Sequence, residues 1–283
     1  MKENLTVGEC FGFYRDEHLQ VATASPERAD FAWQRLRPHF TKVKLADLTP
    51  ARITRYSNSR LQRGVSAGTI NRELGVLVAA LKWAYRSGRI DRVPFVQRLA
   101  APASKKRWLD DDEIAALLSA AASYPHVLAF VQIGLLTGQR QEAILSLTWG
   151  QVDFKRGEID FRDPTAIHAG RRKGRGFVPM SDQLRKILED LKVDAEGPWV
   201  IRYNGFRVTK IYTAWNAIVA TAGLKDVTPH VLRHTAATRM INSGIPLIDA
   251  ARVLGHASSR VTEQIYAHHL PRHLKSAVTS LEL

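Results

Sequence analysis

Cysteine is nearly absent from this sequence, which has a single one, Cys10, among 283 residues. One thiol cannot form an internal disulfide, and it excludes every zinc site that is built from several cysteines. Long apolar runs are missing as well, because the stretch 127–136 is interrupted by Gln132 and Gly134 and falls short of the roughly 20 residues that a membrane span requires. The first ten residues also lack the apolar segment of a secretory signal. We therefore expect a cytoplasmic protein with no membrane partner.

Acidic residues are too few to balance the basic ones. The chain has 41 Lys and Arg against 27 Asp and Glu, which gives a formal charge of +14. Both parts contribute, since residues 1–104 hold 17 basic and 9 acidic side chains and residues 105–283 hold 24 and 18. A globular chain with this excess of positive charge favours a polyanionic partner, and double-stranded nucleic acid is the expected one.

Several helix starts can be located from short motifs. Thr49-Pro50 and Thr228-Pro229 each place a capping residue before a proline, the residue that suits the first helical position. Ser25-Pro26 has the same form. Together with the spacing of apolar residues, these motifs predict four helices and no strand in the first hundred residues, near 6–21, 26–38, 50–62 and 67–87.

A change of pattern divides the chain. The stretch 91–110 mixes prolines, alanines and basic residues without periodicity, as linkers do. We place the boundary after residue 102, which gives a helical domain at 1–102 and a second domain at 103–283. In the second domain, short β-prone runs between 149 and 180 predict a small antiparallel sheet, and helices resume near 181. The expected fold class is mainly α with a small antiparallel β-sheet.

The sequence HVLRH, residues 230–234, is the first candidate site. His230 and His234 have the four-residue spacing of a metal-binding pair, but there is no glutamate between them and no evident third ligand. Arg233 would repel a dication, whereas a guanidinium grips phosphate oxygens well. We therefore expect an anion here, and neither a metal nor a cofactor. The segment 134–140 is a residue short of a nucleotide-binding P-loop and lacks its lysine.

Four segments occur in an order that is hard to produce by chance: TGQRQEAILSLTW, a basic hairpin that ends in FVPM, HVLRHTAATRM and LGHASSRVTEQIYAHH. In order and spacing they resemble the catalytic domain of the tyrosine recombinases, the phage integrase family, over residues 105–270. The segment GTINRELGVLVAALKWAYRSGRI also resembles that family's helical core-binding domain, although this signature is weaker by itself. The resemblance implies a helical core-binding domain followed by a mixed α/β catalytic domain.

The resemblance also assigns roles to residues that match the family's motifs. Tyr266 is the expected nucleophile, which forms a 3′-phosphotyrosyl link to DNA, and Arg140 and Arg233 are expected to hold the scissile phosphate. His256 is expected to donate to the same phosphate, and His230 to accept the tyrosine proton or to orient its neighbours. His234 is expected to be structural. None of these roles requires ATP or a metal.

The general acid is harder to assign. In the family a lysine of the β-hairpin protonates the leaving 5′ oxygen, commonly about eight residues before the closing Val-Pro. Counting back eight residues from Pro179 reaches Arg171, but arginine loses its proton too reluctantly for this role. Lys173, six residues before Pro179, is our candidate. The alternative is that Arg171, Arg172, Lys173 and Arg175 only touch the DNA backbone.

The predicted function is site-specific DNA recombination, as in integrases of phages or other mobile elements. Alternatives are a type IB-like topoisomerase, a non-catalytic DNA-binding protein and a metal-dependent hydrolase. The resemblance further implies a homotetramer on paired DNA sites, with a monomer or weak dimer in solution, associated with the nucleoid. After Pro271, Leu274, Val278 and Leu281 form an apolar stripe. We expect this tail to dock on a neighbouring subunit, with docking on its own domain as the alternative.

Overall fold

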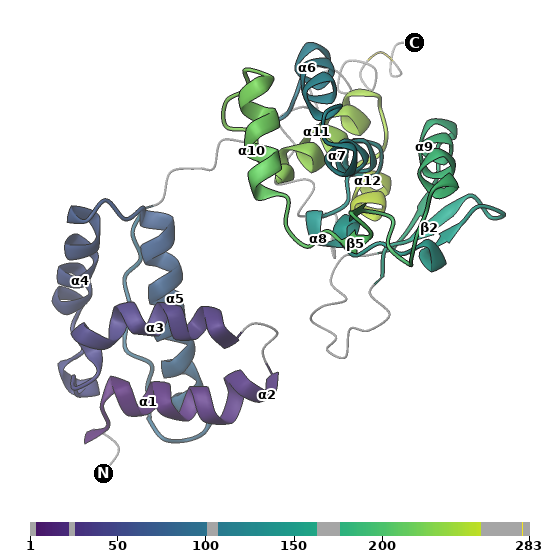
Figure 1. The fold of residues 1–283 in the computed structure, drawn as a ribbon. Coiled ribbons are helices and arrows are strands. Elements are labelled where there is room, and N and C mark those ends of the chain that lie inside the picture. The colour runs from purple at the N-terminus through teal and green to yellow at the C-terminus, as the bar shows by residue number, and fades with distance from the viewer. Residues whose placement is uncertain (1–3, 23–25, 101–106, 163–175, 256–278, 280–283) are drawn as a thin grey trace. The chain divides into compact units, whose positions relative to one another are not determined.

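The computed structural model describes residues 4–22, 26–100, 107–162, 176–255 and 279 (Figure 1). The chain divides into two compact units, residues 1–104 and 105–283. Each unit has its own hydrophobic core.

Within the described residues of unit 1, every regular element is helical, and the one isolated β-bridge pairs Thr6 with Lys44. Helix α5 packs against α1, α3 and α4. Ser66 caps its start by accepting a hydrogen bond from the backbone N–H of Thr69 at 3.3 Å. Ile70, Leu74, Leu77 and Leu81 are fully buried on the face that the periodicity predicted. The helical elements are α1 (Val7–Tyr14), η2 (Arg15–Leu19), α2 (Gln20–Ala22), α3 (Pro26–Phe40), η3 (Leu45–Asp47), α4 (Pro50–Gln62) and α5 (Ala67–Arg86).

The proline-based helix starts are confirmed. Helices α3 and α4 begin at Pro26 and Pro50, and in unit 2 α11 begins at Pro229. The side chains of Thr49 and Thr228 make no capping hydrogen bond, however, so extended backbone before a proline is enough to set these boundaries. The helix predicted near 6–21 is also present, but η2 is a π-helical turn within it.

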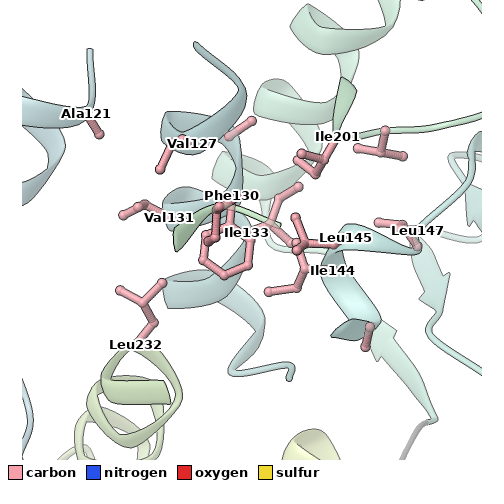
Figure 2. Close-up of a cluster of buried hydrophobic side chains, with 14 of the residues drawn as sticks. Ala121, Val127, Phe130, Val131, Ile133, Ile144, Leu145, Leu147, Ile201 and Leu232 are labelled. Atoms are coloured by element: carbon pink, nitrogen blue, oxygen red, sulfur yellow. The ribbon is translucent and has the colours of Figure 1, made fainter. Parts of the chain in front are cut away.

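Unit 2 is built around the apolar helix α7, which packs against α6, α8, α9 and α11. Figure 2 shows Phe130, Val131 and Ile133 of α7 in this core, with Leu232 of α11 beside them. Because α7 is only 13 residues long, it is too short to span a bilayer. The same holds for every helix within the described ranges, none of which is long and apolar enough to cross a membrane. The helical elements are α6 (Asp111–Ala121), α7 (Pro125–Thr137), α8 (Gln141–Leu145), η4 (Trp149–Gln151), α9 (Asp182–Val193), α10 (Tyr212–Thr221), α11 (Pro229–Asn242) and α12 (Leu247–Leu254).

The predicted sheet lies where the sequence placed it. Strands β1 (Val152–Asp153), β2 (Glu158–Asp160) and β3 (Phe177–Pro179) pair antiparallel in that order. Val152 and Val178 both lie opposite Ile159, and all three are buried against the core of unit 2. Mainly α with a small antiparallel sheet is therefore confirmed as the fold class.

A second small sheet was not predicted. Strands β4 (Arg202–Tyr203) and β5 (Phe206–Arg207) form a hairpin whose turn is Asn204-Gly205. Both turn residues have positive φ, 49° and 79°. Asn-Gly is the residue pair that favours such a turn, so the signal was present in the sequence, but strands of two residues are too short to show an alternating pattern.

Candidate active site

The turn that follows α7 carries Arg140, the first of the candidate residues along the chain. Gly138 ends this helix in the left-handed conformation, with φ 63°. A Cβ at Gly138 would lie 2.6 Å from Cδ2 of Leu254 and 3.2 Å from Cβ of Ala236. Glycine is thus needed both for the backbone conformation and for the close approach of α11 and α12. Two residues later Arg140, half-buried, is the N-cap of α8.

Arg233 is a buried cation that joins two helix ends. It is 4% exposed, and its Nη1 donates to the carbonyl oxygens of Gly138 at 3.0 Å and of Leu254 at 2.7 Å. These carbonyls lie at the C-terminal ends of α7 and α12, where unpaired carbonyl groups and the helix dipole favour positive charge. Carbonyl oxygens carry no net charge, so the two bonds orient the guanidinium group without neutralising it.

His230 lies one turn before Arg233 on α11. Its side chain reaches the surface. Even so, the surrounding protein removes part of its hydration and lowers its pKa below the ordinary 6.5, and the positive charges of Arg233 and Arg140 lower it further. The imidazole is therefore neutral near pH 7 and able to accept a proton. Arg233 follows His230 by one turn on α11, and its bond to the carbonyl of Gly138 holds this helix beside the turn that leads to Arg140.

His234 serves as a packing partner of His230. Its ring is half-buried and meets the His230 ring edge to face, with centroids 4.7 Å apart. Within the described ranges, no three His, Cys, Asp or Glu side chains gather into a group that could bind a metal ion. The structure thus presents the histidine pair beside two guanidinium groups, an arrangement that attracts anions rather than dications.

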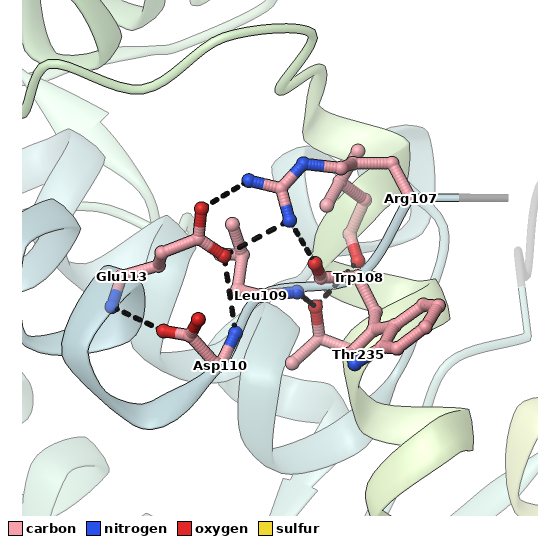
Figure 3. A network of polar contacts seen from close by, with 7 residues as sticks. Arg107, Trp108, Leu109, Asp110, Glu113 and Thr235 are labelled. Atoms are coloured by element: carbon pink, nitrogen blue, oxygen red, sulfur yellow. Dashed lines mark hydrogen bonds and ion pairs between the residues drawn. The ribbon is translucent and has the colours of Figure 1, made fainter. Parts of the chain in front are cut away.

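The first residues of unit 2 help to hold α11 in place (Figure 3). The backbone N–H of Leu109 donates to Oγ1 of Thr235 at 2.9 Å, and that hydroxyl donates to the carbonyl of Val231 at 2.9 Å. Nearby, Arg107 pairs with Glu113, whose carboxylate also accepts from the backbone N–H of Asp110. Thr235 is fully buried two residues after Arg233. Sequence reasoning missed it, because a buried threonine has no distinguishing pattern.

Three of the six candidate residues lie outside the described residues. Lys173 belongs to 163–175, the connection between β2 and β3. His256 and Tyr266 belong to 256–278, which follow the left-handed Gly255 at the end of α12. Gln139, in contrast, is a buried residue of this region that the motif analysis passed over. It stands at the variable position of the Thr-Gly-x-Arg pattern, so its residue type carried no signal.

Known proteins share both this sequence and this fold. Residues 107–273 match the phage integrase family. The tyrosine recombinase XerC of Oceanobacillus iheyensis is 27% identical over 257 residues, covering 82% of this chain and 80% of that protein. A XerC-like tyrosine recombinase of Caldanaerobacter subterraneus subsp. tengcongensis is 24% identical over 282 residues, covering 84% and 72%.

Among solved structures, the Tn1549 transposon integrase in complex with transposon right end DNA superposes with a TM-score of 0.83 at 19% identity, covering 98% of this chain and 99% of that one. A lambda integrase dimer bound to a core site gives 0.74 at 19% identity, covering 93% and 77%. These likenesses describe the fold.

The family match covers more than half of the chain and includes the turn at Arg140 and the helix with His230 and Arg233. The chain therefore belongs to the phage integrase family. Its activity is that of a site-specific tyrosine recombinase, the cleavage and rejoining of DNA strands, and this is favoured over the topoisomerase and over a non-catalytic DNA-binding protein.

Proposed function

We propose that Arg140, His230 and Arg233 form, together with Lys173, His256 and Tyr266, a single site that cleaves one DNA phosphodiester at a time. The observation that carries the proposal is the bond from Arg233 to the carbonyl of Gly138, two residues before Arg140, with His230 one turn before Arg233 on α11. Two cations at one place match the two non-bridging oxygens of a phosphate. Their preorganised charge stabilises the pentacoordinate transition state, in which the phosphoryl oxygens share the developing negative charge.

In the proposed reaction the phenol oxygen of Tyr266 attacks the scissile phosphorus, and His230 takes the phenol proton. The bond from phosphorus to the 5′ oxygen breaks, and Lys173 protonates the departing oxygen. The product is a 3′-phosphotyrosyl link and a free 5′ hydroxyl. The 5′ hydroxyl of a second strand then attacks the same phosphorus and releases the tyrosine, which takes a proton back. One phosphoester bond forms for each that breaks, so no ATP is consumed.

His230 suits the role of proton acceptor. A lowered pKa keeps the imidazole neutral at the pH of the cell, and a neutral imidazole can accept the phenol proton. His256 is assigned to a hydrogen bond with the phosphate, by its place in the Leu-Gly-His motif. This motif begins at Leu254, whose carbonyl accepts from Arg233, so the bond ties the start of the motif to the arginine of the site.

The partner is double-stranded DNA, which residues 1–102 and 103–283 bind together. Residues 1–102 act as the core-binding domain and 103–283 as the catalytic domain. The excess of basic side chains in both parts supports this assignment. A cytoplasmic location at the nucleoid follows from the substrate.

Recombination requires two DNA sites, so the active assembly is a homotetramer on paired sites, formed from monomers or weak dimers. The apolar stripe after Pro271 docks on the neighbouring subunit. Truncation after His269 then leaves binding to a single site intact and weakens cooperative assembly on paired sites, as measured by gel shift. Equal assembly of the truncated and full chains would mean that the tail serves its own subunit.

The deciding experiment uses nicked duplex DNA that carries the direct repeats flanking the gene. A nick a few nucleotides to the 3′ side of the cleavage site lets the short fragment that carries the new 5′ hydroxyl dissociate after cleavage, so the covalent intermediate accumulates. In EDTA, followed by denaturation in detergent, the full chain should become covalently joined to DNA, and Tyr266→Phe should not. Release of free DNA ends that depends on added metal would instead identify a hydrolase and refute the proposal.

A further inference from the structure

Gln139 is a buried polar residue next to the site. It stands between Gly138 and Arg140 and is 4% exposed. Its side-chain Nε2 donates to the carbonyl of Val253 at 2.6 Å, and its backbone N–H donates to Oγ1 of Thr137 at 3.3 Å. A buried amide group is costly unless it is hydrogen-bonded, so this contact across 114 residues of chain determines where the side chain can lie.

The partner of Gln139 is the same helix end that holds Arg233. The last carbonyls of a helix have no partner within the helix. At the end of α12, the carbonyl of Val253 accepts from Gln139 and that of Leu254 accepts from Arg233 at 2.7 Å. Arg233 also bonds the carbonyl of Gly138, directly before Gln139. The turn before Arg140 and the side chain of Arg233 are thus both hydrogen-bonded to the end of α12.

A fixed position for both arginines matters because guanidinium groups that share one site have like charge and repel each other. Arg233 is oriented by its two bonds to carbonyl oxygens. Arg140 begins a helix of only five residues, which by itself gives little rigidity. Transition-state stabilisation needs donors held to about half an ångström, and a displaced guanidinium loses most of its effect.

We propose that Gln139 is a positioning residue that fixes the Arg140 turn to the end of α12, and so sets the separation of the Arg140 and Arg233 guanidinium groups. The inference rests on the proposed function of these two arginines, and it assigns Gln139 no contact with DNA. It predicts that loss of the Nε2 donor displaces Arg140 while the fold and the binding of DNA are kept.

The chain offers a clean substitution. Oε1 of Gln139 is buried, and no donor among the described residues bonds it. Gln139→Met keeps the length of the side chain and removes this unpartnered acceptor together with the Nε2 donor, so the loss of stability is limited to that of the Val253 carbonyl, which loses its donor. Ile218→Val is the matched control, because Ile218 is fully buried in α10 of the same unit and the change reduces packing without touching the site.

The first measurement is the titration of His230 by NMR in the full chain without DNA. The charge of Arg140 lowers the pKa of His230, so displacement of Arg140 raises it. In Gln139→Met the pKa of His230 should rise toward its value in Arg140→Met, and in Ile218→Val it should equal that of the unmodified chain. An unchanged His230 pKa in Gln139→Met would overturn the inference, whether or not the chain cleaves DNA.

The second measurement is the single-turnover rate of covalent joining to the nicked duplex. Gln139→Met should slow it by about tenfold or more, since one preorganised donor is displaced rather than removed. Affinity for DNA should not change. On DNA with a methyl group in place of one non-bridging oxygen of the scissile phosphate, less charge needs stabilising, so the defect should shrink.

An equal defect on both DNAs, or one no larger than that of Ile218→Val, would indicate a merely structural role. Failure of the unmodified chain to join DNA would refute the proposed function, and the titration would still decide the role of Gln139.

Discussion

The two units treat buried charge in different ways. In unit 1, Glu73 is 5% exposed and accepts hydrogen bonds from Tyr56 at 2.6 Å and from Arg60 at 3.1 and 2.6 Å. The carboxylate is therefore cancelled by an opposite charge. In unit 2, Arg233 is 4% exposed, and its Nη1 bonds two neutral carbonyl oxygens.

In the proposed function, the charge of Glu73 serves the fold, whereas the charge of Arg233 serves the binding of a phosphate. The ion pair in unit 1 links α4 to α5. The opposite charges of Arg60 and Glu73 largely cancel each other. The carbonyl oxygens of Gly138 and Leu254 fix the direction of the Arg233 side chain, and the charge of Arg233 lowers the pKa of His230.

The largest effect is expected from Arg233→Met. The change removes the charge and keeps an apolar side chain of similar length, but it leaves the carbonyls of Gly138 and Leu254 without this donor, which should cost about 1–3 kcal/mol of stability. Cleavage should fall by roughly 10²–10³, the cost of losing one preorganised donor. The rate of covalent joining and the thermal unfolding of the variant test both parts. A variant that is strongly destabilised but cleaves normally when folded would mean that Arg233 serves the fold and not the site.

The opposite result is expected for Glu73→Ala in unit 1. Without the carboxylate, the charge of Arg60 and the hydroxyl of Tyr56 lose their partner in a buried place. Breaking such a pair should destabilise unit 1 by about 3 kcal/mol. Urea denaturation followed by hydrogen exchange in α4 and α5 measures this. Cleavage per folded molecule should not change, and if it does, the ion pair also supports the site.

Two glycines, one in each unit, allow the same comparison for the backbone. Gly64 and Gly138 have similar positive φ values, 75° and 63°, but a Cβ at Gly64 meets nothing within 4 Å. Gly64→Ala should cost only the strain of the left-handed conformation, about 1 kcal/mol. Gly138→Ala adds the clash with Leu254 and Ala236 and should cost more than twice that. Equal losses in chemical denaturation would show that the contacts around Gly138 are loose.

The smallest effect concerns two histidines of unit 2. Burial alone lowers the pKa of His126, whereas for His230 the charges of Arg233 and Arg140 add to burial. Salt screens charges but not burial, so raising the salt concentration should raise the pKa of His230 and leave that of His126 unchanged. NMR titration at two salt concentrations tests this, and equal shifts would contradict it.

These two pKa shifts also determine whether the free energy of unfolding rises or falls with pH. Below pH 6.5 the unfolded chain binds more protons at these histidines than the folded chain does, because folding lowers both pKa values. Their contribution therefore makes stability fall as the pH drops through this range.

The helices were the most predictable part of the fold. Threonine-proline pairs and the regular spacing of Ile70, Leu74, Leu77 and Leu81 are local signals, and the structure confirms them. A local signal is present at the start of α6 as well, where Asp110 and Glu113 form a capping box. The hairpin at Asn204-Gly205 was missed, because its strands depend on tertiary pairing more than on pattern.

The sequence pointed to the candidate residues of the site, but it did not point to the residues that hold them in place. Arg140, His230 and Arg233 stand in motifs whose order along the chain identified them, and the bond from Arg233 to the carbonyl of Gly138 joins their helix α11 to the turn before Arg140. The roles of Lys173, His256 and Tyr266 stay predictions, because these three lie outside the described residues. Gln139 and Thr235 had no motif, since their partners Val253 and Leu109 lie 114 and 126 residues away in the chain.

The sequence alone thus determined the residue types that can perform the chemistry, the helices that carry them and the positive charge that attracts DNA, because these depend on neighbouring residues and on composition. Only the tertiary structure decided how the guanidinium of Arg233 is held, since its partners come from the ends of two helices that are distant in the chain. The physical reason is that hydrogen bonds of buried side chains depend on which backbone groups packing leaves without a partner, and no local pattern records that.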